Sequence, residues 1–317
     1  MSGSGASSGI HAIVNPRSAG GRTGRDWPEI KSALRARLGP LDASFTDGPM
    51  HAAALTASAL KAGADLILSV GGDGTLNECV NGFFENGEAL NAAAELGVIT
   101  SGTGGDFRKT FDIGAGPQAA IERLANGNRR RIDAGRLTFT GDDGGEVRRY
   151  FINIASFGLS GEVDRAVNRA RIAKWFGGRF AFAWCSFTTL LSWRGIPVRL
   201  RIDDAFDETV NLSTVALCNG NFFGGGMQVA PRADPSDGLF DVVIMEDTGP
   251  WRALRNAGAI YEGRHVEQPS VRVLRGERIR AAPVDPARHV LLDIDGEAPG
   301  RLPVECEVLP DALTFRC

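Results

Sequence analysis

Three glycine-rich segments lie within the first 110 residues, and each carries polar groups suited to binding a phosphate. They span residues 15–21 (NPRSAGG), 71–75 (GGDGT) and 100–107 (TSGTGGDF). Each follows an apolar run that reads as a strand, and a loop that leads from a strand into a helix directs backbone N–H groups toward an anion. One such loop is equally typical of a tight turn. Three on successive strands predict a nucleotide site, because these loops gather at the carboxyl ends of a parallel sheet.

The second segment contains the most specific chemistry. Asp73 supplies a carboxylate that could organise Mg²⁺, and Thr75 supplies a hydroxyl at the start of a helix. The chain has no G-x-x-x-x-G-K-[ST] motif, which excludes a P-loop, and no G-x-G-x-x-G after its first strand, which excludes the dinucleotide fingerprint. The alternative for Asp73 is a structural Asp-Gly turn.

A second group of acids lies close to the C-terminus. Asp293, Asp295 and Glu297 belong to or follow the apolar run 289–294 (HVLLDI). Alternation along a strand predicts that these three carboxylates share one face. A carboxylate within hydrogen-bond reach of a hydroxyl can accept its proton during phosphoryl transfer. The alternative is an acidic hairpin tip without a catalytic role.

The first half of the chain alternates apolar strands with helices, which is typical of a parallel sheet covered by helices. We expect strands at residues 11–14, 41–45, 65–70 and 96–99, and helices at 26–37, 50–61, 76–84 and 117–125.

The second half has the pattern of antiparallel strands. Val198, Leu200 and Ile202 alternate with charged residues, and the turns are rich in Asp, Gly and Pro. The predicted fold is therefore α/β plus all-β: a parallel-sheet nucleotide domain and a β-sandwich-like domain. Further strands are expected at 209–218, 240–245, 270–274, 289–294 and 303–309. The predicted boundaries are a flexible leader at 1–9, an α/β domain at 10–132 and a β-rich domain at 133–317.

Composition excludes several classes of protein. The formal net charge is −3, which is too balanced for a chain that binds the nucleic-acid backbone. Hydrophobic residues make up 43%, too many for a disordered chain. The chain has no run of about 20 uncharged apolar residues, which is the length needed to span a bilayer. The five cysteines form no C-x-x-C pair, so we expect reduced thiols in a cytoplasmic protein.

The glycine loops carry a family resemblance when they are read with three further motifs. The set resembles the diacylglycerol kinase catalytic family of lipid kinases, and most of all its soluble bacterial members, which are relatives of sphingosine and ceramide kinases. GGDGT alone is shared with NAD kinases and is similar to phosphofructokinase loops. The motifs in order are NPRSAGG (15–21), GGDGTLNECVNG (71–82), GTGGDF (102–107), NGNFFGGGMQVAP (219–231), DPSDGLFDV (234–242) and DIDGE (293–297).

The resemblance implies that an N-terminal domain similar to NAD kinase and phosphofructokinase binds ATP and that the C-terminal domain binds the lipid. It also implies Mg²⁺ as a cofactor, with Asp73 placed to orient it at the phosphates. Residues matching the family's nucleotide contacts are Asn15, Pro16, Arg17, Ser18, Ala19, Thr46, Gly72, Asp73, Gly74, Thr75, Leu76, Asn77, Glu78 and Thr103.

The same resemblance assigns roles in the second domain. Glu297 matches the proton acceptor, with Asp295 as the alternative. Asp237 matches the side-chain ligand of a Mg²⁺ site, beside the backbone carbonyls of Asp234 and Leu239. That Mg²⁺ could be structural, and a plain turn at 236–238 is the competing interpretation.

Two positions depart from the family pattern. Ala19 stands where the first loop usually has glycine, and Gly105 stands where the third loop usually has asparagine. The missing amide removes hydrogen-bonding groups near the nucleotide or the lipid head. The resemblance therefore does not assign the ligand contacts of the third loop, and a non-catalytic lipid or nucleotide sensor remains an alternative.

The expected activity is transfer of the γ-phosphate of ATP to the primary hydroxyl of a membrane lipid, with diacylglycerol preferred. Ceramide, sphingosine and phosphatidylglycerol present the same group and remain alternatives. A small-molecule kinase of the NAD kinase type is a further alternative, because it shares the GGDG loop. An assay with NAD would separate these two classes of substrate.

The chain could meet its substrate at the inner face of a membrane as a peripheral protein. Residues 180–193 are uncharged, but as a helix they reach only about 21 Å, so a core helix competes with an interfacial element. Residues 219–227 are an apolar, glycine-rich candidate for the lipid pocket. Edge strands of the β domain could pair with a second copy and form a homodimer. Basic residues preceding the uncharged run are Arg165, Arg169, Arg171, Lys174 and Arg179.

Overall fold

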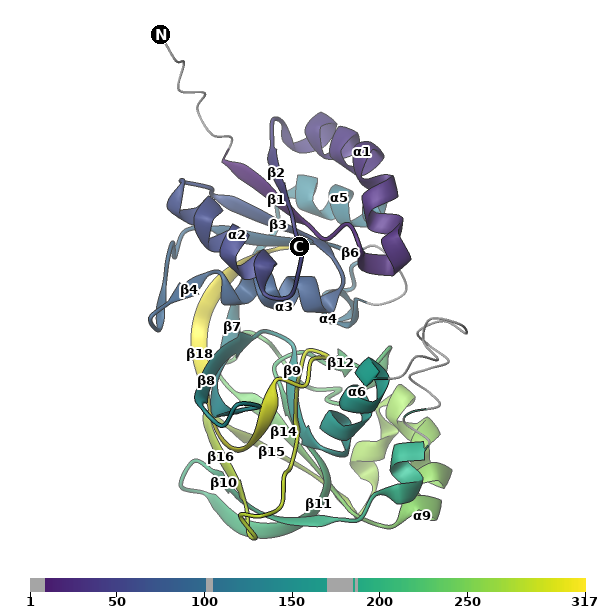
Figure 1. Ribbon diagram of the computed structural model, residues 1–317. Helices are drawn as coiled ribbons and strands as arrows, with labels where there is room; N and C mark the ends of the chain where they lie inside the picture. Colours follow the sequence, from purple (N-terminus) through teal and green to yellow (C-terminus); the bar gives the residue numbers. More distant parts are fainter. Residues whose placement is uncertain (1–8, 101–104, 170–184, 186–187) are drawn as a thin grey trace. The chain divides into compact units, whose positions relative to one another are not determined.

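The computed structural model describes residues 9–100, 105–169, 185 and 188–317 (Figure 1). The chain divides into two compact units. One runs to Asp133 and also contains Asp311–Cys317, and the other is Ala134–Pro310. The predicted leader lies almost wholly outside the described residues. Residues 311–317, expected in the β-rich domain, belong instead to the first unit, because the end of the last strand pairs there.

The first unit is built on a parallel sheet. Its strands are β1 (Ile10–Val14), β2 (Asp42–Phe45), β3 (Leu66–Gly71) and β6 (Glu95–Thr100), joined by the end of β18 (Gly300–Arg316). The order is β2-β1-β3-β6-β18, and every pairing is parallel, as the sequence predicted. The order reverses between β1 and β3, which is where open α/β sheets bind ligands at the carboxyl ends of their strands.

Helices cover this sheet in two pairs. α1 packs beside α5, α2 packs beside α3, and each pair also contacts the strands. Right-handed crossovers place the two pairs on opposite faces. The helices are α1 (Ser18–Leu38), α2 (His51–Lys61), α3 (Asp73–Asn81), α4 (Asp106–Thr110) and α5 (Pro117–Asn126), with a small hairpin of β4 (Phe84–Glu85) and β5 (Glu88–Ala89) after α3.

The second unit is antiparallel β structure. Burial alternates strictly along β10 (Ile196–Ile202), so its predicted alternating pattern is confirmed. The strand order is β15-β14-β11-β10-β16-β18; β7 pairs with β18 and β8 with β7, while β9 pairs with β11 and β17 with β9. The other strands are β7 (Arg129–Gly141), β8 (Glu146–Phe151), β9 (Ile154–Gly158), β11 (Phe206–Cys218), β14 (Phe240–Glu246), β15 (Val271–Gly276), β16 (Arg278–Pro283) and β17 (Leu292–Ile294).

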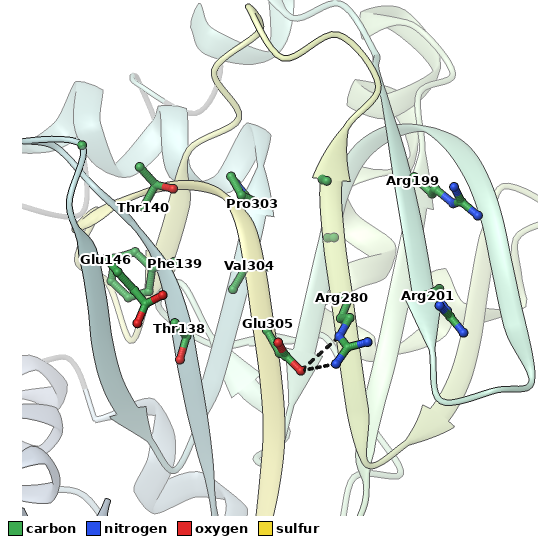
Figure 2. A pocket seen from close by; sticks show the side chains of 13 residues that line it. Thr138, Phe139, Thr140, Glu146, Arg199, Arg201, Arg280, Pro303, Val304 and Glu305 are labelled. Atoms are coloured by element: carbon green, nitrogen blue, oxygen red, sulfur yellow. Dashed lines mark hydrogen bonds and ion pairs between the residues drawn. The ribbon is translucent and has the colours of Figure 1, made fainter. Parts of the chain in front are cut away.

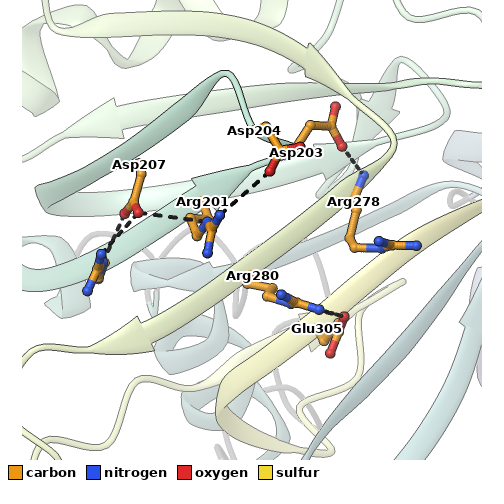
Figure 3. Close-up of polar contacts among 8 residues, drawn as sticks. Arg201, Asp203, Asp204, Asp207, Arg278, Arg280 and Glu305 are labelled. Atoms are coloured by element: carbon orange, nitrogen blue, oxygen red, sulfur yellow. Dashed lines mark hydrogen bonds and ion pairs between the residues drawn. The ribbon is translucent and has the colours of Figure 1, made fainter.

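The exposed face of this sheet carries a row of charges across four strands (Figure 3). Arg201 lies directly opposite Arg280, and like charges in that position repel each other. Acids on the two neighbouring strands, β11 and β18, offset this repulsion. Asp207 lies opposite Arg201, and Glu305 accepts hydrogen bonds of 3.0 and 2.7 Å from the Arg280 guanidinium. Pairs as exposed as these contribute little to stability.

Smaller elements flank the β structure. They are α6 (Leu159–Arg169), α9 (Pro250–Asn256), the 3₁₀ turns η1 (Ala257–Glu262) and η2 (Arg264–Glu267), and a hairpin of β12 (Phe222–Phe223) and β13 (Met227–Gln228). Half of the uncharged run 180–193 lies outside the described residues. Among the helices that the structure describes, none has the length and apolar character needed to cross a membrane.

The pairing of β7 with β8 predicts a sensitive position in the second unit. Gly135 lies opposite Phe151, and a methyl group on Gly135 would overlap the Phe151 ring. Gly135→Ala should therefore lower the free energy of unfolding by about 1–3 kcal/mol in urea denaturation. Gly258→Ala is the control, because a methyl group there meets no atom within 4 Å. Equal stability of the two variants would contradict the packing described for this hairpin.

Candidate active site

The loops that follow β1 and β3 meet in the first unit. The backbone N–H of Asn15 donates to the Val70 carbonyl at 2.9 Å. Its side-chain amide donates to the Thr75 hydroxyl at 3.1 Å. The structure therefore brings together two predicted nucleotide loops at the carboxyl ends of adjacent strands.

Asp73 connects the second loop to the third. Its Oδ2 atom accepts hydrogen bonds from the backbone N–H groups of Gly105, at 2.9 Å, and Asp106, at 3.0 Å. Its Oδ1 atom is buried and has no hydrogen-bond partner among the described residues. Burial raises the pKa of Asp73, the backbone N–H donors partly offset this, and the nearby charge of Asp106 adds to it.

The free Oδ1 atom of Asp73 suits a divalent cation. Mg²⁺ prefers hard oxygen ligands, and protein sites often supply one or two carboxylates while phosphates and water complete the shell. Within the described ranges, no three His, Cys, Asp or Glu side chains form a cluster able to hold a metal ion. The geometry therefore fits a cation that arrives with a phosphate-bearing ligand rather than a cage made only of protein.

The first loop has an unusual backbone. Ala19, Gly20 and Gly21 have φ values of 53°, 67° and 83°, so three consecutive residues adopt the left-handed conformation. Only glycine does so without steric cost, so Ala19 is strained by roughly 1–2 kcal/mol. Ser18 holds the loop by donating to the Asn15 carbonyl at 2.9 Å, and Arg17 is exposed beside it.

The remaining predicted contacts on α3 have structural partners. The Leu76 side chain is buried in the core, and Asn77 is buried and accepts a bond from the Asn81 amide. Glu78 accepts a hydrogen bond of 2.9 Å from the N–H of Ala52 in the first turn of α2. Only their backbones remain suited to a nucleotide, and their contacts stay predictions.

Other predicted contacts lie at the base of the loops. Thr46 is buried and its N–H donates to Val14 at 2.9 Å, and the Pro16 carbonyl accepts from Gly24 at 3.2 Å. Gly72 precedes α3, and Gly74 lies in its first turn, where helix N–H groups lack intrahelical partners. Thr103 lies outside the described residues.

The three acids of the second unit are arranged around a tight turn rather than along one strand face. β17 ends at Ile294, and Asp295 and Gly296 have φ values of 50° and 89°. Ile294 and Glu297 exchange backbone hydrogen bonds of 2.8 and 3.1 Å across this turn. The prediction that alternation places the acids on one face is therefore wrong. The Asp-Gly pair, which favours such hairpin turns, was the signal that could have revealed it.

Each of these acids has a different environment. Asp293 is buried and accepts hydrogen bonds from the Ser156 hydroxyl, at 3.0 Å, and from the Gly296 N–H, at 2.9 Å. Asp295 accepts a bond of 3.1 Å from the N–H of Ile154. Glu297 is exposed. The first two acids hold the turn, and Glu297 is the carboxylate that a substrate can approach from solvent.

The predicted Mg²⁺ loop at 234–239 is closed by its own contacts. One oxygen of Asp237 accepts a bond of 3.1 Å from the N–H of Leu239, and the other pairs with Arg275. Asp234 accepts a bond of 3.0 Å from the N–H of Ser236. A cation at Asp237 would have to compete with Arg275, so the fit to a metal is poor and this site stays a prediction.

Sequence reasoning missed two asparagines that fix the loop 219–223. Asn153 donates to the Phe222 carbonyl at 3.0 Å, and Asn219 donates to the Ile152 carbonyl at 2.8 Å. Both residues are buried. The signal was a polar residue within an otherwise apolar run.

A cavity of about 540 Å³ lies on the exposed sheet face, and none of the predicted site residues lines it (Figure 2). Arg199, Arg201, Arg280 and Glu305 contribute to its wall. Arg199 and Arg280 already pair with Asp207 and Glu305.

Comparison with known proteins identifies the family. Residues 9–137 match the diacylglycerol kinase catalytic domain, and residues 153–317, more than half of the chain, match the YegS C-terminal NAD kinase beta sandwich-like domain. A diacylglycerol kinase of Bacillus subtilis is 31% identical over 246 residues, which cover 76% of this chain and 74% of the relative. The chain belongs to the diacylglycerol kinase family of lipid kinases.

Other diacylglycerol kinase relatives extend the match over nearly the whole chain. The diacylglycerol kinase of Mycobacterium tuberculosis is 29% identical over 306 residues, covering 96% of this chain and 93% of the relative. A Bacillus anthracis diacylglycerol kinase structure aligns with a TM-score of 0.67 at 18% identity, over 97% and 96% of the two chains. Yeast NADH kinase complexed with NADH aligns with a TM-score of 0.51 at 13% identity, over 96% and 82%. These structures support the fold, including its NAD kinase-like character.

The environment of Asp73 in this diacylglycerol kinase family member predicts a linked effect on stability and activity. Because burial raises its pKa, the folded protein holds the Asp73 proton more tightly than the unfolded chain. Stability should therefore fall as the pH rises from 3.8 through the raised pKa, and Asp73→Asn should lack this contribution. The Tm of the variant relative to the wild type should rise over that window, and its kcat at pH 7.5 should fall roughly 10²-fold.

The matched control is Asp112→Asn, at an exposed position near the same loop. It should follow the wild type in both measurements. A Tm difference for Asp73→Asn that does not change with pH would contradict the burial assigned to its carboxylate.

Proposed function

We propose that this chain transfers the γ-phosphate of ATP to the primary hydroxyl of diacylglycerol. The observation that carries the proposal is Asp73, whose carboxylate joins two phosphate-type loops and keeps one buried oxygen without a hydrogen-bond partner among the described residues. Family membership supports a lipid as acceptor, and the relatives named diacylglycerol kinase favour this lipid over ceramide, sphingosine or phosphatidylglycerol.

The nucleotide is proposed to bind in the first unit. The N-terminus of α3 offers backbone N–H groups and the positive end of the helix dipole to its phosphates. Gly71 allows the loop to lie close to the helix, because a side chain there would collide with Thr75. Asn15 fixes the Thr75 hydroxyl, so the loop is organised before the nucleotide arrives.

Asp73 is proposed to hold Mg²⁺ bound to the ATP phosphates. When bound, the cation neutralises charge on the transferred phosphoryl group, which is where most of the catalytic effect arises in kinases. The protein's own contribution is positional. Two backbone N–H groups fix the orientation of the Asp73 carboxylate, so its second oxygen keeps one direction.

Glu297 is proposed as the base that accepts the proton of the lipid hydroxyl. It is exposed at the hairpin tip, while Asp293 and Asp295 hold the turn through hydrogen bonds to the backbone. A base must reach the hydroxyl directly, which favours the exposed carboxylate. The alternative, Asp295, has one oxygen already engaged by Ile154.

A non-catalytic sensor and a small-molecule kinase are the competing functions. Gly105 motivated the sensor, but here its N–H supports Asp73, a role that needs no side chain. A kinase of the NAD type is supported only by the fold-level likeness to yeast NADH kinase. Both therefore rank below the lipid kinase.

A transfer assay tests the function directly. The full chain is incubated with Mg²⁺ and γ-labelled ATP, with separate acceptors: diacylglycerol, ceramide, sphingosine, phosphatidylglycerol and NAD. We expect label in phosphatidate and little in the other products. Label in NADP would favour the small-molecule kinase, and ATP binding without transfer to any acceptor would favour the sensor.

The roles of the hairpin acids are separable by substitution. Glu297→Gln should lower kcat by about 10²–10⁴-fold with little change in Tm, because it removes only the proton acceptor. Asp295→Asn is the matched comparison, since asparagine also tolerates the left-handed conformation at φ 50°. It should retain most activity. A larger loss of kcat in Asp295→Asn than in Glu297→Gln would transfer the base assignment to Asp295.

A further inference from the structure

Exposed aromatic and aliphatic side chains are concentrated in one short segment of the second unit. Among the described residues, six large hydrophobic side chains are exposed, and three of them lie within the thirteen residues 250–262. These are Trp251 at 76% exposure, Leu254 at 37% and Tyr261 at 54%. Such clustering marks an interaction surface, whereas single exposed hydrophobic residues carry no such meaning.

The same segment carries positive charge that the protein does not neutralise. Arg252 and Arg255 are exposed on α9 and make no ion pair with any described residue. Arg264, by contrast, is paired with Glu262. Arginines on the strands of the sheet are also paired with acids. The two unpaired guanidinium groups therefore favour an anionic partner.

The spacing of these residues gives α9 two kinds of contact on one side. Trp251, Leu254 and Arg255 are three and four positions apart, so they are neighbours on the surface of a helix. Trp and Tyr combine an apolar ring with a polar tip and concentrate where membranes meet water. Arginine can extend its charged end toward lipid phosphates while its stem contacts apolar surface.

The exposed segment 250–262 packs against the loop 219–227, the predicted candidate for the lipid pocket. η1 contacts β13, and Ile260, Met227 and Phe223 pack against the same buried cluster. This cluster includes Val229 and Ala230 from the motif 219–231. α9 in turn contacts η1 within the second unit, where Figure 1 labels it. The apolar loop and the exposed segment therefore form one continuous packed element.

We propose that α9 and η1 dock this protein onto the surface of an anionic lipid bilayer, with Trp251, Leu254 and Tyr261 entering the interface and Arg252 and Arg255 contacting lipid phosphates. This inference rests on the proposed function, because a lipid acceptor lies in a bilayer. In the sequence, this surface lies after the basic and uncharged stretch at 165–193. Charge complementarity selects the bilayer, since unpaired arginines beside aromatic rings match a phosphate layer above hydrocarbon.

Vesicle co-sedimentation tests the surface. The full chain is mixed with vesicles of phosphatidylcholine containing 30 mol% phosphatidylglycerol, and with phosphatidylcholine alone. Trp251→Ala should weaken binding to the anionic vesicles on the order of tenfold, because the ring no longer enters the interface. The double variant Arg252→Gln, Arg255→Gln should lose about fivefold per arginine on anionic vesicles only. Val284→Ala, another exposed apolar residue at 56%, is the matched control and should bind normally.

Activity on a short-chain diacylglycerol dispersed in detergent separates docking from catalysis. The docking variants should keep wild-type turnover there and lose it only on vesicles. Vesicle binding that depends on Trp251 without any kinase activity would overturn the proposed function and leave the docking surface. Unchanged vesicle binding in both variants would overturn the docking surface, as would a dimer in light scattering that Trp251→Ala dissociates.

Discussion

The buried carboxylate of Asp73 is the interaction on which the nucleotide half of this protein depends. One of its oxygens accepts the N–H groups of Gly105 and Asp106, so the loop after β3 and the start of α4 are fixed to each other. The hydrogen bond from Asn15 to Thr75 fixes the loop after β1 to the same helix. Three segments that are distant in sequence thus form one frame, and that frame leaves a carboxylate oxygen for a ligand. Keeping a charge in this setting is unfavourable by itself, as its raised pKa indicates. A stability cost of this kind is typical of functional sites.

The second unit uses its acids in the opposite way. Asp293 and Asp295 accept hydrogen bonds from backbone N–H groups. These bonds fix the shape of the hairpin tip, on which Glu297 is exposed to solvent. A carboxylate that holds the turn and the exposed carboxylate proposed as the base therefore lie within five residues of each other. Burial distinguishes them, because Asp293 is buried and Glu297 is exposed. Ion pairing likewise separates the arginines of the sheet face, which pair with acids, from those of α9, which pair with no acid that the structure describes.

Much of this could be predicted from the sequence, for identifiable reasons. The parallel strands and the alternation of β10 were predictable because local burial patterns determine them. The hairpin of β7 and β8 was missed, since the N-terminal arginines of β7 are exposed and β7 also pairs with β18, far along the chain. The pairing of Asp237 with Arg275 joins residues 38 positions apart, and no local pattern encodes it. The alternation rule failed at Asp295, which has a left-handed backbone conformation. The chain reverses there, so the side chains that follow no longer alternate in step with those of the strand before it.

Calorimetric titration of ATP, with and without Mg²⁺, is the most direct test of the central role of Asp73. It is performed on the wild-type chain and on Asp73→Asn, whose remaining oxygen can still accept the two N–H groups. If Asp73 holds a cation at the phosphates, Mg²⁺ should tighten ATP binding to the wild type at least tenfold and have little effect on the variant, while the affinities without Mg²⁺ stay similar. Equal tightening by Mg²⁺ in both proteins would show that the cation is held elsewhere and would contradict this account.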